Sequence, residues 1–547
     1  MGSIASTFPN GLRVKQIVGS LTIADQHRVL LADQPGAGKT AQALVGLEMT
    51  GLFERETHTL IMCNTTGCQL TWSQELKHRV ATQYDVVIAD LTDTEGRKTA
   101  PSTRMRNELL GRKIIEAADL GLPLIVLANF ESIRWKAGKT AAVPNMFALA
   151  LDAIVIDEGH LVLPTMEDGA NKLTQFWYGL TKLDISSHAI RLDMTGTPDR
   201  GKLWNRYGHW KFLYPEAHKS FWAWARLNFV VSPAQWGGAE IGKLRNPTAW
   251  AAYDRQHMIR RTKAEMLEGL PEKQWAGEGG IDLPMTPLQE DAYIDYQNKL
   301  SDKEKALFAE AKIHREGGNE RKAREIENQA SALKLQFALR SRQMATCTWT
   351  LKENETGSVH AVPIVAGPDS SNKLAWVLDW LDTRGYTPDG WDPTQGKVVI
   401  VSYFAEVLFW LEAELKAAGI HSRVMSGVTP GTMKQEIEAE FQRGDLRIVL
   451  LSGYLGVSIN LDAADDMIFL DPVHDPDLME QVEDRIHRAS RNHQCTYWRL
   501  ASMDTADMVV LQTVDSRYRE TRKSYEGSRG VQFARRMLGL EQIESAA

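Results

Sequence analysis

Short apolar runs bounded by turn residues recur along the chain up to about residue 195. Stretches with helical character lie between several of these runs, for example at Thr40–Met49 and Gln69–Arg79. Strand runs that alternate with helical stretches are typical of βαβ units, in which helices cover both faces of a parallel sheet. The pattern predicts a first α/β lobe with strands at Val29–Ala32, Leu60–Cys63, Val86–Ala89, Leu124–Ala128, Ile154–Ile156 and Leu192–Met194.

The same alternation begins again near the middle of the chain and predicts a second α/β lobe. Between the lobes, residues 204–250 contain six tryptophans, for which we favour packing within helices over base stacking. Residues 287–342 are rich in helix-forming side chains, and Gly317 and Gly318 favour two antiparallel helices joined at that point. The strands of the second lobe are expected at Val398–Val401, Ile448–Leu451, Ile468–Leu470 and Tyr497–Leu500.

This organisation predicts two parallel-sheet lobes with helical insertions between them. We expect the first lobe at residues 1–200, a helical region at 201–350, a linker at 351–372, the second lobe at 373–525 and a C-terminal tail at 526–547.

The composition is that of an ordinary globular protein, with 43% hydrophobic and 24% charged residues among 547. The net charge of −7 argues against an overall basic coat for nucleic acid but permits a local basic groove. The four cysteines form no C-x-x-C pair, so neither a disulfide framework nor a zinc site is expected. Without a secretory signal or a run of about 18 apolar residues, the chain is expected in the cytoplasm.

The stretch Gln34–Gln42 reads QPGAGKTAQ and follows the first apolar run. Its glycines let the backbone curl so that N–H groups point into one cavity, Lys39 supplies charge for phosphates, and Thr40 supplies a hydroxyl for Mg²⁺. A helix that begins at Thr40 would present its positive end to the phosphates. The expected ATP-binding residues of this loop are Gly36, Ala37, Gly38, Lys39 and Thr40.

A phosphate loop of this kind needs a carboxylate at the end of a neighbouring strand. The run that ends at Ile156 is followed by Asp157, Glu158, Gly159 and His160. Asp157 is expected to bind Mg²⁺ together with Thr40, and Glu158 to activate the attacking water. Found with the loop on one alternating lobe, this motif predicts an ATPase.

With both motifs placed, the chain resembles superfamily 2 helicases and, within them, the Snf2-like ATP-dependent DNA translocases of the DEGH-box type. The resemblance runs from about residue 11 to about residue 515 and implies two RecA-like lobes. In that family an aspartate commonly introduces the loop, so Asp33 fits the pattern. Two stretches, Ile259–Lys263 and Leu270–Lys273, are close to a signature of Snf2 chains in particular.

The resemblance also assigns roles around the nucleotide. Leu12–Gln16 is similar to the adenine-reading segment, which makes Arg13 and Gln16 candidate ATP contacts. Thr195 and Thr197 lie in a match to the motif that couples hydrolysis to motion between lobes. The next residue but one, Asp199, departs from the leucine usual in the family.

In the second lobe, the stretch from residue 481 to 488 closely matches the sixth family motif, which makes Gln481, Arg485 and Arg488 candidate catalytic residues. The γ-phosphoryl group spreads negative charge over its oxygens, and a guanidinium can meet that charge bidentately. We expect these arginines to serve ATP when the lobes close, which is the basis of a motor cycle.

Other matched motifs are those that grip the phosphates of a nucleic-acid strand. The alternative is a structural role, because short polar residues that follow strands commonly cap loops. Arg260–Arg261 and Arg340–Arg342 are further basic candidates, equally consistent with solvated helix surface. The candidate nucleic-acid contacts are Asn64, Asn129, Ser402, Phe404, Ser452 and Gly453.

Together these observations predict an ATP hydrolase that uses ATP and Mg²⁺ to translocate on double-stranded DNA and to remodel protein–DNA complexes or branched DNA. A strand-separating DNA or RNA helicase is one alternative, although no pin or wedge can be identified. An ATP-gated nucleic-acid clamp with little turnover is another, and the intact Lys39, Asp157 and Glu158 speak against it. Because no separate reader domain accompanies the motor, we expect a bacterial or bacteriophage setting, or a subunit that other proteins direct.

Overall fold

The computed structural model describes residues 12–93, 101–136, 139–140, 142–164, 175–199, 202–233, 239–267, 270–277, 280–353, 359–363, 368–386, 396–453, 459–472, 476–488 and 493–511. These residues divide into two compact units, one before residue 270 and one from residue 270 onward. Each unit contains its own parallel sheet.

The first unit is built on a seven-stranded sheet with the order β11-β1-β8-β7-β2-β4-β3, in which every neighbouring pair is parallel. Its strands are β1 Arg28–Leu31, β2 His58–Cys63, β3 Val87–Asp90, β4 Leu124–Asn129, β7 Ala150–Asp157, β8 Asp184–Met194 and β11 Met258–Ile259, with the small pairs β5 Trp135–Lys136 and β6 Lys139–Thr140, and β9 Phe229–Pro233 and β10 Ala239–Leu244. Its helices are α2 Val14–Gln26, α3 Lys39–Glu48, α4 Thr65–Gly67, α5 Ser73–Glu75, α6 Thr103–Leu120, α7 Gln175–Leu180, α8 Arg206–Leu213, α9 Phe221–Asn228, α10 Pro247–His257 and α11 Lys263–Met266.

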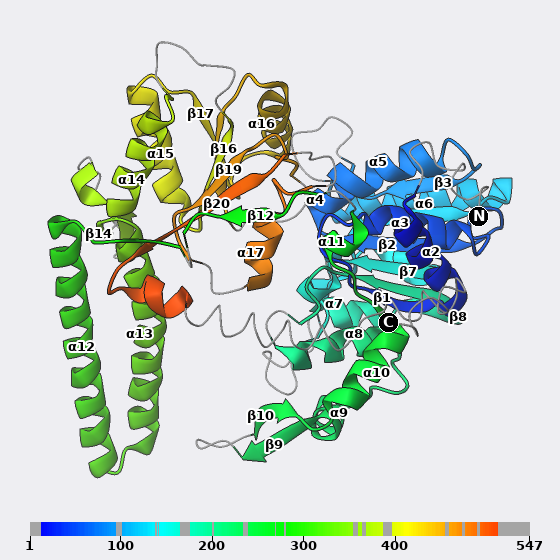
Figure 1. Cartoon of the computed structure of the whole chain (residues 1–547). Coiled ribbons are helices and arrows are strands. Elements are labelled where there is room, and N and C mark those ends of the chain that lie inside the picture. The colour runs from blue at the N-terminus through cyan, green and yellow to red at the C-terminus, as the bar shows by residue number, and fades with distance from the viewer. Residues whose placement is uncertain are drawn as a thin grey trace, which may run out of the picture. The chain divides into compact units, whose positions relative to one another are not determined.

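Helices cover both faces of this sheet, as the continuous apolar runs predict (Figure 1). Because side chains alternate along a strand, Leu30 and Leu60 belong to one core, whereas the adjacent Leu31 and Ile61 belong to the other. The first core is closed by α6, α7, α8 and α10, and the second by α2, α3 and the π-helical segments Cys68–Trp72 and Leu76–Val80.

The tryptophan-rich region packs onto the first core. Trp210, Trp224 and Trp250 are buried, and the ring centroids of Trp224 and Trp250 lie 5.8 Å apart. The preference for packing is therefore confirmed for these three residues, while Trp236 lies outside the described residues.

The second unit holds another parallel sheet, with the order β12-β20-β19-β16-β18-β17 and with β13 also paired to β20. Its strands are β12 Lys273–Trp275, β13 Ile281–Leu283, β14 Trp349–Glu353, β15 Val359–Pro363, β16 Val398–Ser402, β17 Ser422–Met425, β18 Ile448–Ser452, β19 Asp466–Phe469 and β20 Cys495–Ser502. Its helices are α12 Pro287–Glu316, α13 Glu320–Thr346, α14 Asn372–Thr383, α15 Ala405–Ala417, α16 Gly431–Arg443 and α17 Pro476–Glu483.

The two long helices α12 and α13 form the expected antiparallel hairpin (Figure 1). The turn lies at Gly317 and Gly318, where Gly318 has a φ of +77° that favours glycine. An ion pair of 2.6 Å between Arg315 and Glu327 joins the helices close to the turn.

The expected α/β fold with two parallel sheets and helical insertions is thus the observed one, and every predicted strand run falls on a strand. The details differ in two places. Residues 201–350 are divided between the two units, and the segment expected as a linker contains β15, which pairs antiparallel with β14. None of the described helices is both long and apolar enough to cross a membrane.

Candidate active site

The phosphate loop connects β1 to α3 at the carboxyl end of β1. Gly36 and Gly38 have φ angles of +79° and +76°, which other residues rarely adopt, so the loop can curl with its amides inward. Lys39 is the first residue of α3 and is 9% exposed, and its Nζ donates to the Asp33 carbonyl at 2.9 Å. Thr40 follows as the second residue of the helix. The helix N-terminus and the lysine thus meet at one loop.

Gln16, the expected adenine reader, lies directly against this loop. Its Nε2 donates to the Ala37 carbonyl at 3.1 Å, and its Oε1 accepts from the Arg13 backbone N–H at 2.9 Å. A Cβ at Gly38 would lie 2.3 Å from Gln16 Nε2, so only glycine fits there. Arg13 itself is exposed at the start of α2. The structure therefore brings Gln16 to the loop, with Arg13 next to it only through the hydrogen bond to Gln16.

Asp157 ends β7, two strands away from β1. Its Oδ2 accepts from Trp72 Nε1 at 2.8 Å and from the Cys63 thiol at 3.7 Å. Burial, and then the charge of Glu158, raise the pKa of Asp157 to about 6, while the nearby Lys39 ammonium acts in the opposite direction. Two adjacent carboxylates in a poorly solvated position make a place where added positive charge is favourable.

Glu158 connects this carboxylate to the next strand. It is 6% exposed and has a φ of +57°, an uncommon conformation for a residue with a side chain and one that recurs at functional sites. Its Oε2 lies 3.2 Å from His160 Nδ1, and the same nitrogen lies 2.7 Å from the Thr195 hydroxyl. Thr195 Oγ1 accepts in turn from the Thr197 backbone N–H at 3.0 Å. A continuous polar chain therefore runs from the carboxylate motif to the Thr-Gly-Thr-Pro turn.

These residues fit a nucleotide triphosphate with a divalent cation. The loop offers inward amides and a lysine to phosphate oxygens, and the Asp157–Glu158 pair offers carboxylates to a hard cation. The contacts from Trp72 and Cys63 fall on Oδ2 of Asp157 and leave its Oδ1 outside them. No cluster of three or more His, Cys, Asp or Glu side chains suited to a metal occurs among the described residues. Mg²⁺ is usually bound through one or two carboxylates together with substrate phosphates and water, and Thr40 and Asp157 would be its protein ligands here.

The other half of the same sheet edge carries a second polar cluster, at the ends of β2 and β4. Asn129 Nδ2 donates to the Thr65 hydroxyl at 3.0 Å, and its Oδ1 accepts from Arg106 Nη1 at 3.2 Å and from Ser132 Oγ at 2.8 Å. Asn64 caps α4 by accepting from the Gly67 N–H at 2.7 Å. Burial lowers the pKa of Arg106. Both predicted residues of this unit therefore lie at one edge, where Arg106 on α6 contacts Asn129, and Asn129 contacts Thr65, the neighbour of Asn64.

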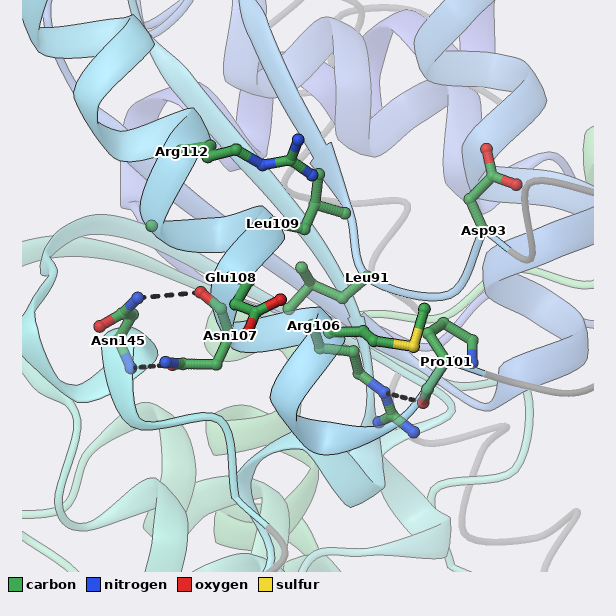
Figure 2. A pocket seen from close by; sticks show the side chains of 11 residues that line it. Leu91, Asp93, Pro101, Arg106, Asn107, Glu108, Leu109, Arg112 and Asn145 are labelled. Atoms are coloured by element: carbon green, nitrogen blue, oxygen red, sulfur yellow. Dashed lines mark hydrogen bonds between the residues drawn. The ribbon is translucent and has the colours of Figure 1, made fainter.

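A cavity of about 680 Å³ lies beside this cluster, between α6 and the end of β3. Figure 2 shows Arg106 at one end, bonded to the Pro101 carbonyl at 3.0 Å, and Asn107 paired with Asn145 at the other. None of the predicted ATP-binding residues lines it. The candidate catalytic residues Lys39, Asp157 and Glu158 lie instead around the phosphate loop.

In the second unit, the predicted nucleic-acid residues are occupied in packing. Ser402 is fully buried and donates to Asp471 Oδ2 at 2.6 Å, and Phe404 is 6% exposed. Ser452 is likewise buried, and a Cβ on Gly453 would lie 2.5 Å from the Tyr403 ring. Ser402 and Phe404 offer little side-chain surface, because both are packed in the interior of this unit. Residues 454–458 of the fifth motif lie outside the described residues.

The sixth motif begins in α17 and continues into the turn after it. Gln481 is partly exposed on α17, whereas Arg485 and Arg488 follow the helix. The Arg485 carbonyl accepts from the Leu461 N–H at 3.0 Å, and Arg488 Nη2 donates to the Ile459 carbonyl at 2.7 Å. Burial lowers the pKa of Arg488, and nearby carboxylates, Asp462 first, oppose that shift. The structure thus groups the two arginines next to the fifth motif.

Of the basic residues considered for nucleic acid, Arg261 and Arg342 are buried, whereas Arg260 and Arg340 are partly exposed. Arg261 is 5% exposed and forms a bidentate ion pair with Asp33, and Arg260 Nη1 donates to the Ala32 carbonyl at 2.6 Å. Arg342 is 8% exposed and donates to the Pro472 carbonyl at 2.9 Å. These three guanidiniums hold the fold together, because buried arginines require carbonyl or carboxylate partners.

Sequence reasoning missed Arg106, the link through His160, and the partner of Asp33. Arg106 lies in the first turn of α6 and belongs to no local motif, so no signal could have found it. Asp33 did carry a signal, because an aspartate directly after an apolar strand run needs a cationic partner when buried. The partner lies 228 positions away, beyond the reach of local pattern.

The family comparisons agree with this geometry. A model of the SNF2-related domain matches residues 15–346, and a model of the helicase conserved C-terminal domain matches residues 383–490. A Caenorhabditis elegans "SWI/SNF-related matrix-associated actin-dependent regulator of chromatin subfamily A-like protein 1 homolog" is 22% identical over 90% of this chain and 58% of its own length. "Chromatin remodeling factor mit1" of Schizosaccharomyces pombe is 21% identical over 90% of this chain and 31% of its own length. "Transcription regulatory protein SNF2" of Saccharomyces cerevisiae is 25% identical over 91% and 27%.

Among solved structures, one described as "Sulfolobus solfataricus SWI2/SNF2 ATPase core in complex with dsDNA" is 18% identical, covers 97% of each chain and gives a TM-score of 0.37. The chain spans 58% or less of the length of the three curated relatives named above. Those relatives are eukaryotic, and the expected bacterial or bacteriophage setting finds no support in them. The domain matches, the first of which covers more than half of the sequence, show that this chain belongs to the SNF2-related family of helicase-type ATPases.

Proposed function

We propose that this chain hydrolyses ATP with Mg²⁺ and uses the cycle to translocate on double-stranded DNA, remodelling protein–DNA complexes or branched DNA. The observation that carries the proposal is the convergence, at one edge of one sheet, of Lys39, the Asp157–Glu158 pair and the His160–Thr195 contact. Membership of the SNF2-related family supports the same reaction.

Each of these residues has a role in binding or in moving a proton. Lys39 and the loop amides bind and orient the phosphates, and Thr40 and Asp157 hold the cation. The cation supplies charge neutralisation at the phosphate oxygens when it is bound. Glu158 orients the attacking water and accepts its proton. Gln16 and Arg13 complete the nucleotide pocket beside the loop.

His160 and Thr195 connect the site of hydrolysis to the Thr-Gly-Thr-Pro turn. Glu158 Oε2 lies 3.2 Å from His160 Nδ1, and the same nitrogen lies 2.7 Å from the Thr195 hydroxyl. A movement of the Glu158 carboxylate would therefore change the contacts of the Thr-Gly-Thr-Pro turn. Thr197 lies in that turn and is held by Thr195. This contact chain supports a coupling role for both threonines.

Arg485 and Arg488 supply the positive charge that the γ-phosphoryl group needs as its bond breaks, and Gln481 offers a neutral hydrogen-bonding side chain beside them. Arg485 is buried, and Arg488 donates to the Ile459 carbonyl, so both guanidiniums are held in direction, and a fixed donor stabilises developing charge better than a mobile one.

The cluster of Asn64, Thr65, Asn129 and Arg106 is the proposed grip on nucleic-acid phosphates. It lies on the same sheet edge as the ATP residues, and its donors are amides, a hydroxyl and a guanidinium, which bind phosphate without reading sequence. Relatives whose names refer to chromatin support duplex DNA as the substrate. Binding is therefore expected to be sequence-independent and to weaken steeply with salt.

The test is steady-state ATP hydrolysis with Mg²⁺, in the presence of duplex DNA, single-stranded DNA, RNA or no nucleic acid, with Lys39→Ala as the blank. We expect the largest stimulation with duplex DNA. A preference for single strands or RNA would favour a conventional helicase. ATP binding without stimulated turnover on any nucleic acid would favour a clamp and contradict the proposed motor.

A further inference from the structure

The indole of Trp72 lies against the carboxylate that is expected to bind Mg²⁺. Trp72 is fully buried at the end of the π-helical segment Cys68–Trp72, and its Nε1 donates to Asp157 Oδ2 at 2.8 Å. An indole N–H donates one hydrogen bond and accepts none. Trp72 can therefore hold a carboxylate oxygen in place, but it offers no ligand atom to Mg²⁺.

A second donor reaches the same oxygen from the neighbouring strand. Cys63 ends β2, which pairs parallel with β7, and its thiol donates to Asp157 Oδ2 at 3.7 Å. The indole makes the stronger of the two contacts, because a thiol is a weak donor and lies farther away. Neither donor contacts Oδ1. The carboxylate is thus held through one of its oxygens, which is a common way for protein groups to orient a metal-binding carboxylate.

The chain between Cys63 and Trp72 fixes the direction of the indole. The Ser73 N–H donates to the Cys68 carbonyl five residues earlier, which is the hydrogen bond of a π-helix. Turns of this kind are rare and occur frequently at functional sites. Cys68 Sγ donates to the Ala128 carbonyl at 3.4 Å, and Trp72 belongs to the second core of the first unit. Backbone and packing together therefore set the direction of the indole N–H.

A neutral donor suits a carboxylate that has to bind a cation. A hydrogen bond to an ionised carboxylate favours the ionised form, which is the form that binds a divalent ion. A lysine or arginine in the place of Trp72 would favour that form too, but its charge would repel the ion. The indole N–H thus supports the negative charge of Asp157 without competing with the cation for it.

We propose that Trp72 is a positioning residue of the nucleotide site, whose N–H holds Oδ2 of Asp157 so that Oδ1 is presented to the divalent cation that accompanies ATP. The inference deepens the proposed function and rests on it, because it assumes that Asp157 is a ligand of that cation. Trp72 acts through Asp157 and not by contact with the nucleotide.

The test measures how tightly the non-hydrolysable ATP analogue adenylyl imidodiphosphate binds to wild type and to Trp72→Phe. Its dissociation constant is determined by titration calorimetry, once with Mg²⁺ and once with EDTA. Phenylalanine keeps an aromatic ring in the core and removes the N–H. Loss of a hydrogen-bond partner of a metal ligand typically weakens metal binding by about 10-fold to 100-fold. We expect the affinity of Trp72→Phe to fall by that factor with Mg²⁺ and to equal that of wild type in EDTA.

Trp250→Phe is the matched control. Trp250 is also buried in the first unit, and its Nε1 has no hydrogen-bond partner among the described residues. This substitution makes the same change of volume without removing a hydrogen bond, so both dissociation constants should equal those of wild type. If Trp72→Phe does not fold, the same assay is made with benzothienylalanine at position 72, which has sulfur in place of the N–H.

Several results would overturn the inference. Wild-type affinity of Trp72→Phe with Mg²⁺ would show that the indole does not position the carboxylate. Equal weakening with Mg²⁺ and in EDTA, or the same loss in Trp250→Phe, would show a general loosening of the core instead. Failure of wild type itself to bind the analogue would contradict the proposed function, and with it the inference that rests on it.

Discussion

The carboxyl edges of the two parallel sheets are built from similar motifs and hold polar side chains in different ways. In the first unit, four polar residues lie at strand ends or just beyond them and interact with one another around the phosphate loop, namely Lys39, Asp157, Glu158 and Thr195. For example, Trp72 and Cys63 both donate to the same carboxylate oxygen of Asp157, Oδ2.

In the second unit, the polar groups at the strand ends form hydrogen bonds with one another. Asp471 accepts from the Ser402 hydroxyl at 2.6 Å and from the Tyr403 N–H at 2.7 Å, and all three residues are buried. The charged residues available for chemistry come instead from the turn after α17. A motif match therefore predicts the fold of both units. The chemical role of a side chain, in contrast, must be judged from the hydrogen bonds and ion pairs that the side chain already makes.

Arg485 provides the largest expected effect, because it tests whether the second unit contributes to hydrolysis at all. An arginine that stabilises transferring phosphoryl charge is worth about 10³–10⁵ in kcat, so Arg485→Ala should lower kcat by about 10³ with a small change in KM. The measurement is steady-state hydrolysis with duplex DNA. Arg423→Ala, on β17 of the same unit, is the control and should retain wild-type turnover. A normal kcat in Arg485→Ala would confine catalysis to the first unit.

Glu158 tests the first unit in the same assay. Glu158→Gln keeps the shape of the side chain and removes its basicity, so kcat should fall by about 10²–10³ while ATP binding persists. Glu316→Gln at the exposed turn of the long helical hairpin is the matched control. Turnover equal to wild type in Glu158→Gln would remove this residue from the proposed mechanism.

Ser402 tests the other side of the comparison, because its hydroxyl serves packing. Ser402→Ala leaves the buried Asp471 carboxylate with one donor fewer, and such a loss costs about 1–3 kcal/mol in the free energy of unfolding. We therefore expect a lower melting temperature of the second unit with kcat unchanged, measured by calorimetry and by hydrolysis below the transition. An unchanged melting temperature with impaired turnover on DNA would return Ser402 to the nucleic-acid contacts.

The phosphate loop and the strands could be predicted from the sequence because each depends on a short local pattern. A glycine-rich turn between an apolar strand and a helix has few structural solutions, so the phosphate loop and its partner Asp157 were predictable. The strands were predictable for a related reason, since continuous apolar runs such as Val398–Val401 suit a sheet buried on both faces.

The remaining features depend on contacts between residues far apart in the chain. Asp33 and Arg261 are separated by 228 positions, so the local pattern at each residue does not show that the two form a pair. Ser402 and Phe404 match motif positions, yet their burial is decided by Asp471 and by α13, which no local pattern shows. Resemblance identifies a position in a motif, while packing determines what its side chain can reach.

The smallest expected effect concerns stability and again separates the two units. Burial lowers the pKa of His218 below 6.5, with the charge of His257 adding to the shift, and burial also lowers the pKa of His257. Both histidines lie in the tryptophan-rich region of the first unit, where Tyr253 and Tyr214 face them.

A lowered pKa means that the unfolded chain takes up protons before the folded chain does. As the pH falls through 6.5 toward the folded pKa values, the unfolded state of the first unit therefore gains stability relative to the folded state. We expect the melting temperature of the first unit to drop over this window, and a double variant with His218→Gln and His257→Gln to lose most of that dependence. The transition of the second unit is the internal control, since the two histidines lie outside it. A first unit whose melting temperature stays constant from pH 7 to below 6 would show that these histidines protonate freely in the folded state, and that the helical region admits water which its packed aromatic rings otherwise exclude.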